Sequence, residues 1–479
     1  MIQPLALEIC VVCLGIFLLM ADSFLVKTDK SALAYGAIVG LAGVFVLSFY
    51  TLPAAPDLAL SGFYVTDTLG MFFKRFALLA TILTVILAID HAPVVARFIP
   101  GSTPQAGVGE FFVLPVFTCA GLMWMASAAD FIMIFCALEL VTISIYIQVA
   151  YMRRSVASLE AGTKYLILGA LSTGFLVYGI TWIFGMTGQT GLMQIGEVLQ
   201  RIPISTGLLF GIGLVLVALG FKIAAAPFQF WVPDVYQGAP TPVTAYLSVA
   251  SKAAGFVVLL RVLEPLLAVP ALQAKLFPVL SLLAVLTLLY GNLAAIPQTN
   301  FKRLLGYSSI AHAGYLLVGV ASLGAFMAGR AIVFYLFGYL LMTFLAFLVL
   351  VPVAKASGGD EISHFNGLGR RSPGLALALL LSMLSLAGIP FTAGFLGKFF
   401  IFEAAMDQQN YVLVVIGVVT VACGFYYYLK VVRAMYWQAP PEDAPEIVVS
   451  APSRVAIICL SALILILGVY PQAILRMFP

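Results

Sequence analysis

Long apolar stretches without a charge recur along this chain, and they limit its fold more than any other feature. Residues 202–221, 331–354 and 455–475 contain twenty, twenty-four and twenty-one uncharged residues. A helix of about twenty mostly apolar residues is long enough to cross the hydrocarbon core of a bilayer. Only 9% of the 479 residues are charged, whereas a soluble domain carries roughly 25% charged residues. The chain is therefore predicted to be an integral membrane protein.

Counting such stretches predicts an all-α, polytopic membrane protein of about fourteen transmembrane helices. The connecting loops are short, and none is long enough to form a soluble core. Two predicted spans contain proline at matching places, because Ala226–Pro227–Phe228 and Ile389–Pro390–Phe391 are related by an offset of 163 residues. Paired interruptions of this kind indicate inverted repeats with a site near the middle of the membrane.

The predicted spans fall into four parts. These are an N-terminal three-helix segment (1–109), a first five-helix repeat (110–263), a second five-helix repeat (276–437) and a C-terminal helix (452–479). Each five-helix repeat contains a Pro-interrupted helix as its fourth span. Because five is an odd number, consecutive repeats insert with opposite topology.

Basic residues predict the orientation in the membrane. If the N-terminus is outside, fourteen Lys and Arg residues fall on the inner side, seven fall on the outer side and three lie within spans. Cytoplasmic loops carry an excess of basic residues. Both termini are therefore predicted on the outer, periplasmic side.

The sequence also excludes several classes of function. It contains no dense basic run for nucleic acid, no nucleotide-binding loop, no haem motif and no iron–sulfur cysteine array. Cys10 and Cys13 form a CxxC pair without a second pair or a histidine cluster, so a metal or redox role is the weaker interpretation. The chain itself is predicted to bind no cofactor and no metal, and to be driven by another protein or by an ion gradient.

Ionisable residues inside the predicted spans are the candidate functional residues, because each costs a few kcal/mol to insert on biological scales. Glu139 lies about three helical turns from either polar end of its span. It is either a protonatable relay residue or a structural contact. Lys222 stands five residues before Pro227. A charged residue beside a broken helix is typical of ion-coupled transporters, and a lysine that reaches the membrane surface is the alternative.

Two further lysines lie deep within spans. Lys252 lies nine residues before Arg261, with Ser248 on the same helical face. Burial disfavours the charged form of a lysine, so Lys252 is a candidate proton donor, and a structural ion pair is the alternative. Lys398 follows the second interruption at Pro390. Its position beside this break mirrors the position of Lys222 beside the first.

Two weaker candidates complete the set. His312 lies in the middle of its span and could carry a proton, although a structural histidine is the commoner case. Lys164 lies near a helix start, where its side chain could instead reach the interface. The six residues alternate acid, base and imidazole, so they could line a water-filled polar axis parallel to the membrane.

Three stretches carry a family resemblance. WVPDVYQGAPTPVTAYLSVASKAAGF, NFKRLLGYSSIAHAGYLLVG and AGIPFTAGFLGKFF resemble the antiporter-like membrane subunits of respiratory complex I, the NADH:quinone oxidoreductase, which are similar to Mrp-type sodium/proton antiporters. PDVYQGAP followed by SVASK resembles the N-type branch of these subunits. An M-type subunit would have glutamate at Lys398, and an L-type subunit would have histidine near Ser248 and a long C-terminal lateral helix.

The resemblance implies roles for particular residues. It assigns proton translocation to Glu139, Lys164, Lys222, Lys252 and Lys398, and it pairs Glu139 with Lys164. Many relatives have a histidine in a Pro-Phe-His-x-Trp stretch, where this chain has Gln229. Glutamine cannot carry a proton, so either that histidine is dispensable or water replaces it.

The resemblance also implies a function. It predicts a non-redox, proton-translocating subunit of an enzyme complex in the bacterial inner membrane. FMN, iron–sulfur clusters and quinone (ubiquinone) would lie in other subunits, where electron transfer from NADH to quinone drives the pumping. The predicted partners are lipid, water, protons and the other membrane-arm subunits, including antiporter-like paralogues. The alternatives are an Mrp-type cation/proton antiporter subunit and a structural scaffold.

Overall fold

The computed structural model describes residues 3–25, 30–51, 62–100, 108–442 and 445–477. Within these ranges the regular secondary structure is helical, apart from three isolated β-bridges. Eleven described helices are long and apolar enough to cross a membrane, and two shorter apolar helices accompany them. The predicted all-α, polytopic fold is thus confirmed, whereas the count of about fourteen spans stays a prediction. Lys27, one of the basic residues used to predict the orientation, lies outside the described ranges.

The helices pack into two compact units. The first unit contains Met1–Val85, Phe98–Ala224 and Ala250–Val279, and the second contains Ile86–Arg97, Ala225–Val249 and Leu280–Pro479. Residues 225–249 of the predicted first repeat therefore group with the second unit. The inverted-repeat relationship stays a prediction.

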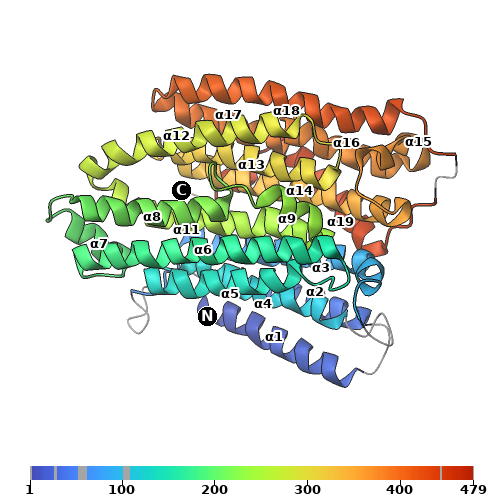
Figure 1. The fold of residues 1–479 in the computed structure, drawn as a ribbon, viewed down its shortest axis with the longest axis horizontal. Helices are drawn as coiled ribbons and strands as arrows, with labels where there is room; N and C mark the ends of the chain where they lie inside the picture. The colour runs from blue at the N-terminus through green and yellow to red at the C-terminus, as the bar shows by residue number, and fades with distance from the viewer. Residues whose placement is uncertain (1–2, 26–29, 52–61, 101–107, 443–444, 478–479) are drawn as a thin grey trace. The chain divides into compact units, whose positions relative to one another are not determined.

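The first unit is built on helices that run alongside one another (Figure 1). Its helices are α1 (Leu5–Phe24), α2 (Ser31–Leu47), α4 (Gly109–Ser127), α5 (Phe131–Val149), α6 (Val156–Thr187), α7 (Leu192–Leu199), α8 (Thr206–Ile223) and α11 (Lys252–Leu267). Helix α6 packs along α8, α4 packs along α5, and α1 packs on α4. Polar side chains fix where these helices begin: Asp130 accepts a hydrogen bond from the Ile132 amide at the start of α5, and Ser205 does the same for Leu208 at the start of α8.

The second unit is organised around one buried helix. Its helices are α9 (Val232–Gly238), α10 (Thr241–Tyr246), α13 (Phe301–Val320), α14 (Ala328–Ser357), η2 (Ile362–Phe365), α15 (Leu368–Arg371), α16 (Pro373–Ala387), α17 (Ala393–Asp407), α18 (Tyr411–Trp437), α19 (Ala451–Val469) and α20 (Gln472–Leu475). Helix α14 packs against α13, α16, α17 and α19. It is apolar on all sides, as expected for a helix enclosed by others. Two helices, α3 (Thr68–Ala96) and α12 (Pro270–Ala295), contribute to both units.

The two spans that contain Pro227 and Pro390 are broken near these prolines, as the sequence predicts. Helix α8 ends just before Ala224, which has a left-handed φ of 65°, and α16 ends just before Gly388, which has φ 90°. A broken helix leaves main-chain carbonyls without helical partners inside the apolar bundle. A third irregularity is the π-helical turn η1 (Leu247–Ser251), which joins α10 to α11 immediately before Lys252. Single π-helical turns often occur at functional sites.

Candidate functional site

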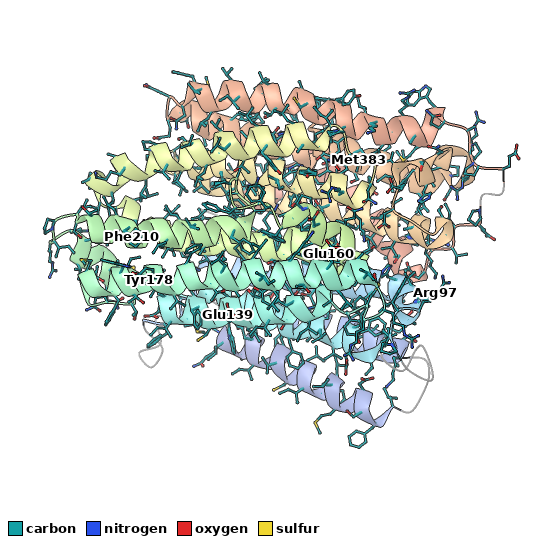
Figure 2. All side chains as sticks on the ribbon, viewed as in Figure 1. Arg97, Glu139, Glu160, Tyr178, Phe210 and Met383 are labelled. Atoms are coloured by element: carbon teal, nitrogen blue, oxygen red, sulfur yellow. The ribbon has the colours of Figure 1, made fainter. Side chains whose placement is uncertain are left out.

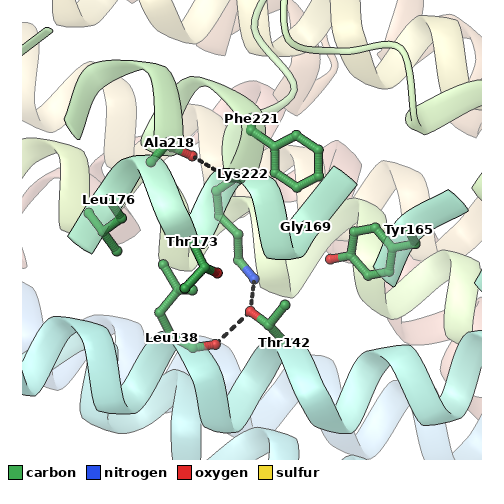
Figure 3. Close-up of a pocket in the computed structure, with 10 residues that line it drawn as sticks. Leu138, Thr142, Tyr165, Gly169, Thr173, Leu176, Ala218, Phe221 and Lys222 are labelled. Carbon is green, nitrogen blue, oxygen red and sulfur yellow. Dashed lines mark hydrogen bonds between the residues drawn. The ribbon is translucent and has the colours of Figure 1, made fainter. Parts of the chain in front are cut away.

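Lys222 is buried in the last turn of α8 and reaches a hydroxyl on another helix (Figure 3). Its Nζ donates a hydrogen bond of 3.2 Å to Thr142 Oγ1 on α5. Thr142 donates its own proton to the carbonyl of Leu138, at 2.6 Å, so its oxygen remains available as an acceptor. A small cavity surrounds Lys222 and has room for about one water molecule. The ammonium is therefore held by a neutral partner beside a space that water can fill.

Glu139 lies one helical turn before Thr142 on α5, where it is half-buried (Figure 2). Its Oε1 accepts a hydrogen bond of 2.7 Å from Thr173 Oγ1 on α6. Glu139 and Thr173 both line an open groove between α5 and α6. Thr173 also lines the cavity around Lys222, and Glu139 interacts electrostatically with Lys222. Thr173 thus links the predicted acid to the predicted base within the first unit.

Lys164 has a different setting from the other candidate lysines. Its Nζ lies 2.7 Å from Glu160 Oε1, and the two side chains are 42% and 60% exposed. The two residues are four positions apart on α6, a spacing at which opposite charges meet on a helix surface. This spacing is readable in the sequence, although the sequence analysis did not use it. The pairing of Lys164 with Glu139 stays a prediction.

Lys252 is buried at the start of α11, directly after the π-helical turn. One turn later, Gly255 allows α11 to pack closely against α8. A Cβ atom at Gly255 would lie 2.9 Å from Ile223 Cγ2 and 3.1 Å from Lys222 Cγ. The helices that carry Lys222 and Lys252 are therefore in direct contact. Ser248, a predicted neighbour of Lys252, donates its hydroxyl proton to the carbonyl of Ala245 at 2.9 Å.

In the second unit, the side chain of Lys398 reaches back from α17 across the break to the end of α16. Its Nζ donates hydrogen bonds to the carbonyls of Leu386, at 2.9 Å, and Ala387, at 2.8 Å. These are the last carbonyls of α16, and the carbonyl end of a helix attracts cations. The ammonium also lies 4.9 Å from the centre of the Tyr315 ring. Gly388 leaves the space for this arrangement, because a Cβ atom there would lie 3.1 Å from Lys398 Cδ.

His312 lies in the same unit between two phenol groups. Its Nδ1 is 2.6 Å from Tyr335 Oη, and its Nε2 is 3.1 Å from Tyr428 Oη. Tyr428 also shares a hydrogen bond with Ser308. A phenol can donate or accept a hydrogen bond, so both imidazole tautomers have partners here. The ring of Tyr335 in turn contacts the ring of Tyr315, which lies beneath Lys398.

The tyrosines around His312 were not singled out from the sequence. Five almost completely buried tyrosines contact His312 or one another: Tyr315, Tyr335, Tyr339, Tyr427 and Tyr428. A buried tyrosine usually has a hydrogen-bond partner for its hydroxyl. Several tyrosines within apolar spans could therefore have indicated a polar interior in this half of the chain.

Gln229 stands where the resemblance expects a histidine. The residue is 2% exposed, and its Oε1 has no hydrogen-bond partner in the described part of the chain. An amide contributes a dipole but no titratable proton. The described ranges also contain no group of three or more His, Cys, Asp or Glu residues arranged to hold a metal ion.

The structure thus gathers the candidate residues into two groups. Glu139, Lys222 and Lys252 lie on contacting helices of the first unit, and His312 and Lys398 are connected through tyrosines in the second unit. A single polar axis through both groups stays a prediction.

Most of the chain is similar in sequence to known proteins. Residues 128–424 match the family described as NADH:quinone oxidoreductase/Mrp antiporter, TM. The chain is 41% identical over 472 residues to "NADH-quinone oxidoreductase subunit N" of Trichlorobacter lovleyi, covering 98% of this chain and 94% of the relative. It is 39% identical to the protein of the same name in Moorella thermoacetica, covering 98% and 95%.

Two solved structures are similar as well. A chain of respiratory complex I from Thermus thermophilus with bound aureothin is 32% identical, with a TM-score of 0.79 and coverage of 98% of both chains. A chain of the Mrp complex from Dietzia sp. is 19% identical, with a TM-score of 0.84 and coverage of 100% and 96%. At that identity, the second similarity speaks for the fold alone.

Proposed function

This chain belongs to the family of antiporter-like membrane subunits that includes subunit N of NADH-quinone oxidoreductase, and from this premise we propose that its buried residues carry protons across the membrane. The chain is a membrane-spanning subunit of a respiratory enzyme complex. We propose that it is itself a proton channel without redox chemistry. FMN, iron–sulfur clusters and quinone would belong to other subunits, and quinone reduction there would drive the pumping.

The observation that carries this proposal is the connection from Glu139 to Lys222. Thr173 holds the carboxylate by a hydrogen bond and also lines the cavity at the ammonium. An opposite charge nearby favours the charged form of a lysine, and its removal favours proton release. A change in the charge or position of Glu139 would therefore control whether Lys222 keeps its proton. The released proton would pass to water in the cavity, leaving a neutral amine.

In the second unit we propose that the tyrosines pass protons between His312 and Lys398, with water completing the step to the amine because Lys398 meets the face of the Tyr315 ring and not its hydroxyl. Each phenol can receive a proton on its oxygen while donating its own, so no lasting charge is needed on the ring. Lys398 would then mark the outward exit, because the broken helix leaves room for water beside the ammonium.

The proposed setting is the bacterial inner membrane, with both termini on the periplasmic side. The neighbours would be other membrane-arm subunits of the complex, including the antiporter-like paralogues. The groove at Glu139 is open to the surface of the first unit between α5 and α6. A neighbouring subunit or lipid would contact the chain there.

Lys222→Ala in the assembled complex tests the proposal, with Lys275→Ala as the matched control. Lys275 is an exposed lysine at the start of α12. In reconstituted vesicles we expect Lys222→Ala to lose most NADH-driven proton pumping, while the control pumps normally. Normal pumping by an assembled Lys222→Ala complex would contradict the proposal.

The Mrp-type alternative shares the fold and makes a different prediction. A cation/proton antiporter would exchange sodium for protons in vesicles without NADH, and it would not copurify with flavin and iron–sulfur proteins. Copurification with such an assembly, without sodium-dependent exchange, would exclude this alternative.

A further inference from the structure

A second group of buried ionisable residues lies away from the residues discussed so far. Glu8 on α1 and Lys74 on α3 are both completely buried, and Lys74 Nζ lies 2.9 Å from Glu8 Oε1. Tyr64, in the loop before α3, donates a second hydrogen bond of 2.9 Å to the same Oε1. Lys74 also donates a hydrogen bond to the Tyr64 hydroxyl. The three side chains therefore form a closed triangle of hydrogen bonds, which we call the Glu8 triad.

The two carboxylate oxygens of Glu8 differ in their hydrogen-bond partners. Oε1 accepts from both the ammonium and the phenol, whereas Oε2 is buried and has no hydrogen-bond partner in the described part of the chain. Buried carboxylate oxygens are rarely left in this state, because a buried polar atom without a hydrogen-bond partner is costly. A proton on Oε2 would remove the negative charge without disturbing either hydrogen bond at Oε1. The geometry thus provides one unoccupied position for a proton.

The Glu8 triad lies close to a surface pocket. Tyr64 is half-buried. Asp67, three residues later, forms a bidentate ion pair with Arg261, with nitrogen–oxygen distances of 2.8 and 3.0 Å. Asp67 and Arg261 line a pocket that also contains Glu197 and Glu264. Lys74 interacts electrostatically with both members of the Asp67–Arg261 pair. Charge in the pocket is therefore felt at the triad.

Few other titratable groups face the triad. Cys119 on α4 interacts electrostatically with Glu8, and the Asp67–Arg261 pair interacts with Lys74. Helix α2 also packs on α1, and its one titratable residue, Tyr35, is exposed.

We propose that the Glu8 triad is a further proton-binding site of this chain, which exchanges one proton with solution through the Asp67–Arg261 pocket. On uptake, an O–H bond forms at Glu8 Oε2, while Lys74 and Tyr64 keep their protons. The net charge of the triad rises from zero to plus one. Proton binding at the triad does not depend on the proposed pumping function. For a pumping chain, the triad would exchange protons with solution on the side of the membrane where α1 begins.

The alternative is a permanent ion pair that only fixes α1 against α3. Removing one member of a buried ion pair is strongly destabilising, whereas replacing both members by uncharged residues is often tolerated. The test therefore uses Glu8→Gln and the double variant Glu8→Gln/Lys74→Met. The matched control is Lys30→Met, because Lys30 forms a largely buried ion pair of 2.7 Å with Asp22 in the same three-helix region.

The measurement is the infrared difference spectrum of the whole complex between neutral and mildly acidic buffer. We expect wild type and Lys30→Met to gain a carboxylic-acid carbonyl band that is lost in Glu8→Gln or, if that variant fails to assemble, in the double variant. An unchanged band in the assembled variant would overturn the proposal and show a permanent ion pair. That result would leave the proposed pumping function intact, because Lys222→Ala tests it separately.

Discussion

The two broken helices hold their lysines in opposite ways. Lys222 precedes its break and donates to a side-chain hydroxyl, with a carboxylate one threonine away. Lys398 follows its break and donates to two main-chain carbonyls over an aromatic ring. Carbonyl dipoles cannot change their charge, whereas a carboxylate can be protonated or moved. We therefore propose that the first unit contains an adjustable control on its lysine, and that the second unit contains a fixed one.

This difference suggests a division of work between the units. In the first, the charge state of Glu139 would decide when Lys222 releases a proton. In the second, fixed dipoles would keep Lys398 in one place while the tyrosines bring protons to it. Substitutions that change whether a side chain can gain or lose a proton, while leaving a side chain of similar size, test this comparison most directly.

The largest effect is expected from Lys398→Arg. A guanidinium could still donate to the carbonyls of α16, but it does not lose its proton in proteins. We expect assembly to be normal and proton pumping per NADH oxidised to be almost abolished in reconstituted vesicles. Full pumping by this variant would show that Lys398 need not titrate, and its assignment as the exit would be dropped.

Glu139→Gln tests the adjustable control in the first unit. The amide keeps a hydrogen bond with Thr173 but removes the charge that acts on Lys222. We expect pumping to fall severely in Glu139→Gln and much less in Glu139→Asp, which keeps the charge. Equal pumping by the Gln and Asp variants would mean that charge at Glu139 is not what matters.

These lysines could be identified from the sequence because the free-energy cost of a charge within an apolar span depends on the neighbouring residues in the sequence. A charge within an apolar span and a proline five residues away are both visible without a structure, so Lys222 and its break could be predicted. The partners could not, because contacts with Thr142 or Tyr315 depend on how each helix is rotated in the bundle. The Glu8 triad was missed for a related reason. Lys74 is one of the seven basic residues that the predicted orientation places on the outer side, and only packing shows that it is buried against Glu8.

Tyr335→Phe should reduce pumping-linked turnover less than the two substitutions above, because it changes one hydrogen bond within the second unit. The substitution removes one hydrogen bond to His312 and keeps the ring packing. Water can replace the lost hydroxyl as a proton carrier, so the remaining cost is one neutral hydrogen bond of about 1 kcal/mol. We therefore expect pumping-linked turnover to fall roughly fivefold. Tyr290→Phe is a control, because Tyr290 on α12 is only half-buried and its ring contacts Tyr307. Equal losses in both variants would exclude a specific role for the Tyr335 hydroxyl.

The smallest effect is expected from Asp67, which lies just before α3 and forms an ion pair with Arg261 of α11. Burial tends to raise the pKa of Asp67, but the hydrogen bonds and positive charge of Arg261 outweigh it, so the pKa is lowered in the folded chain. A carboxyl group with a lowered folded pKa stabilises the fold above its unfolded pKa, and this contribution is lost as the pH falls through the folded pKa. Acidification should therefore destabilise wild type more than Asp67→Asn.

The magnitude is limited because the Asp67 side chain is 41% exposed. Solvent screening reduces such a pair to about 1 kcal/mol or less. The measurement is the thermal unfolding midpoint of the purified complex from neutral pH down to about pH 3, below the usual pKa of aspartate. If Asp67→Asn lost stability on acidification as steeply as wild type does, the pairing of Asp67 with Arg261 would not be the source of the acid sensitivity.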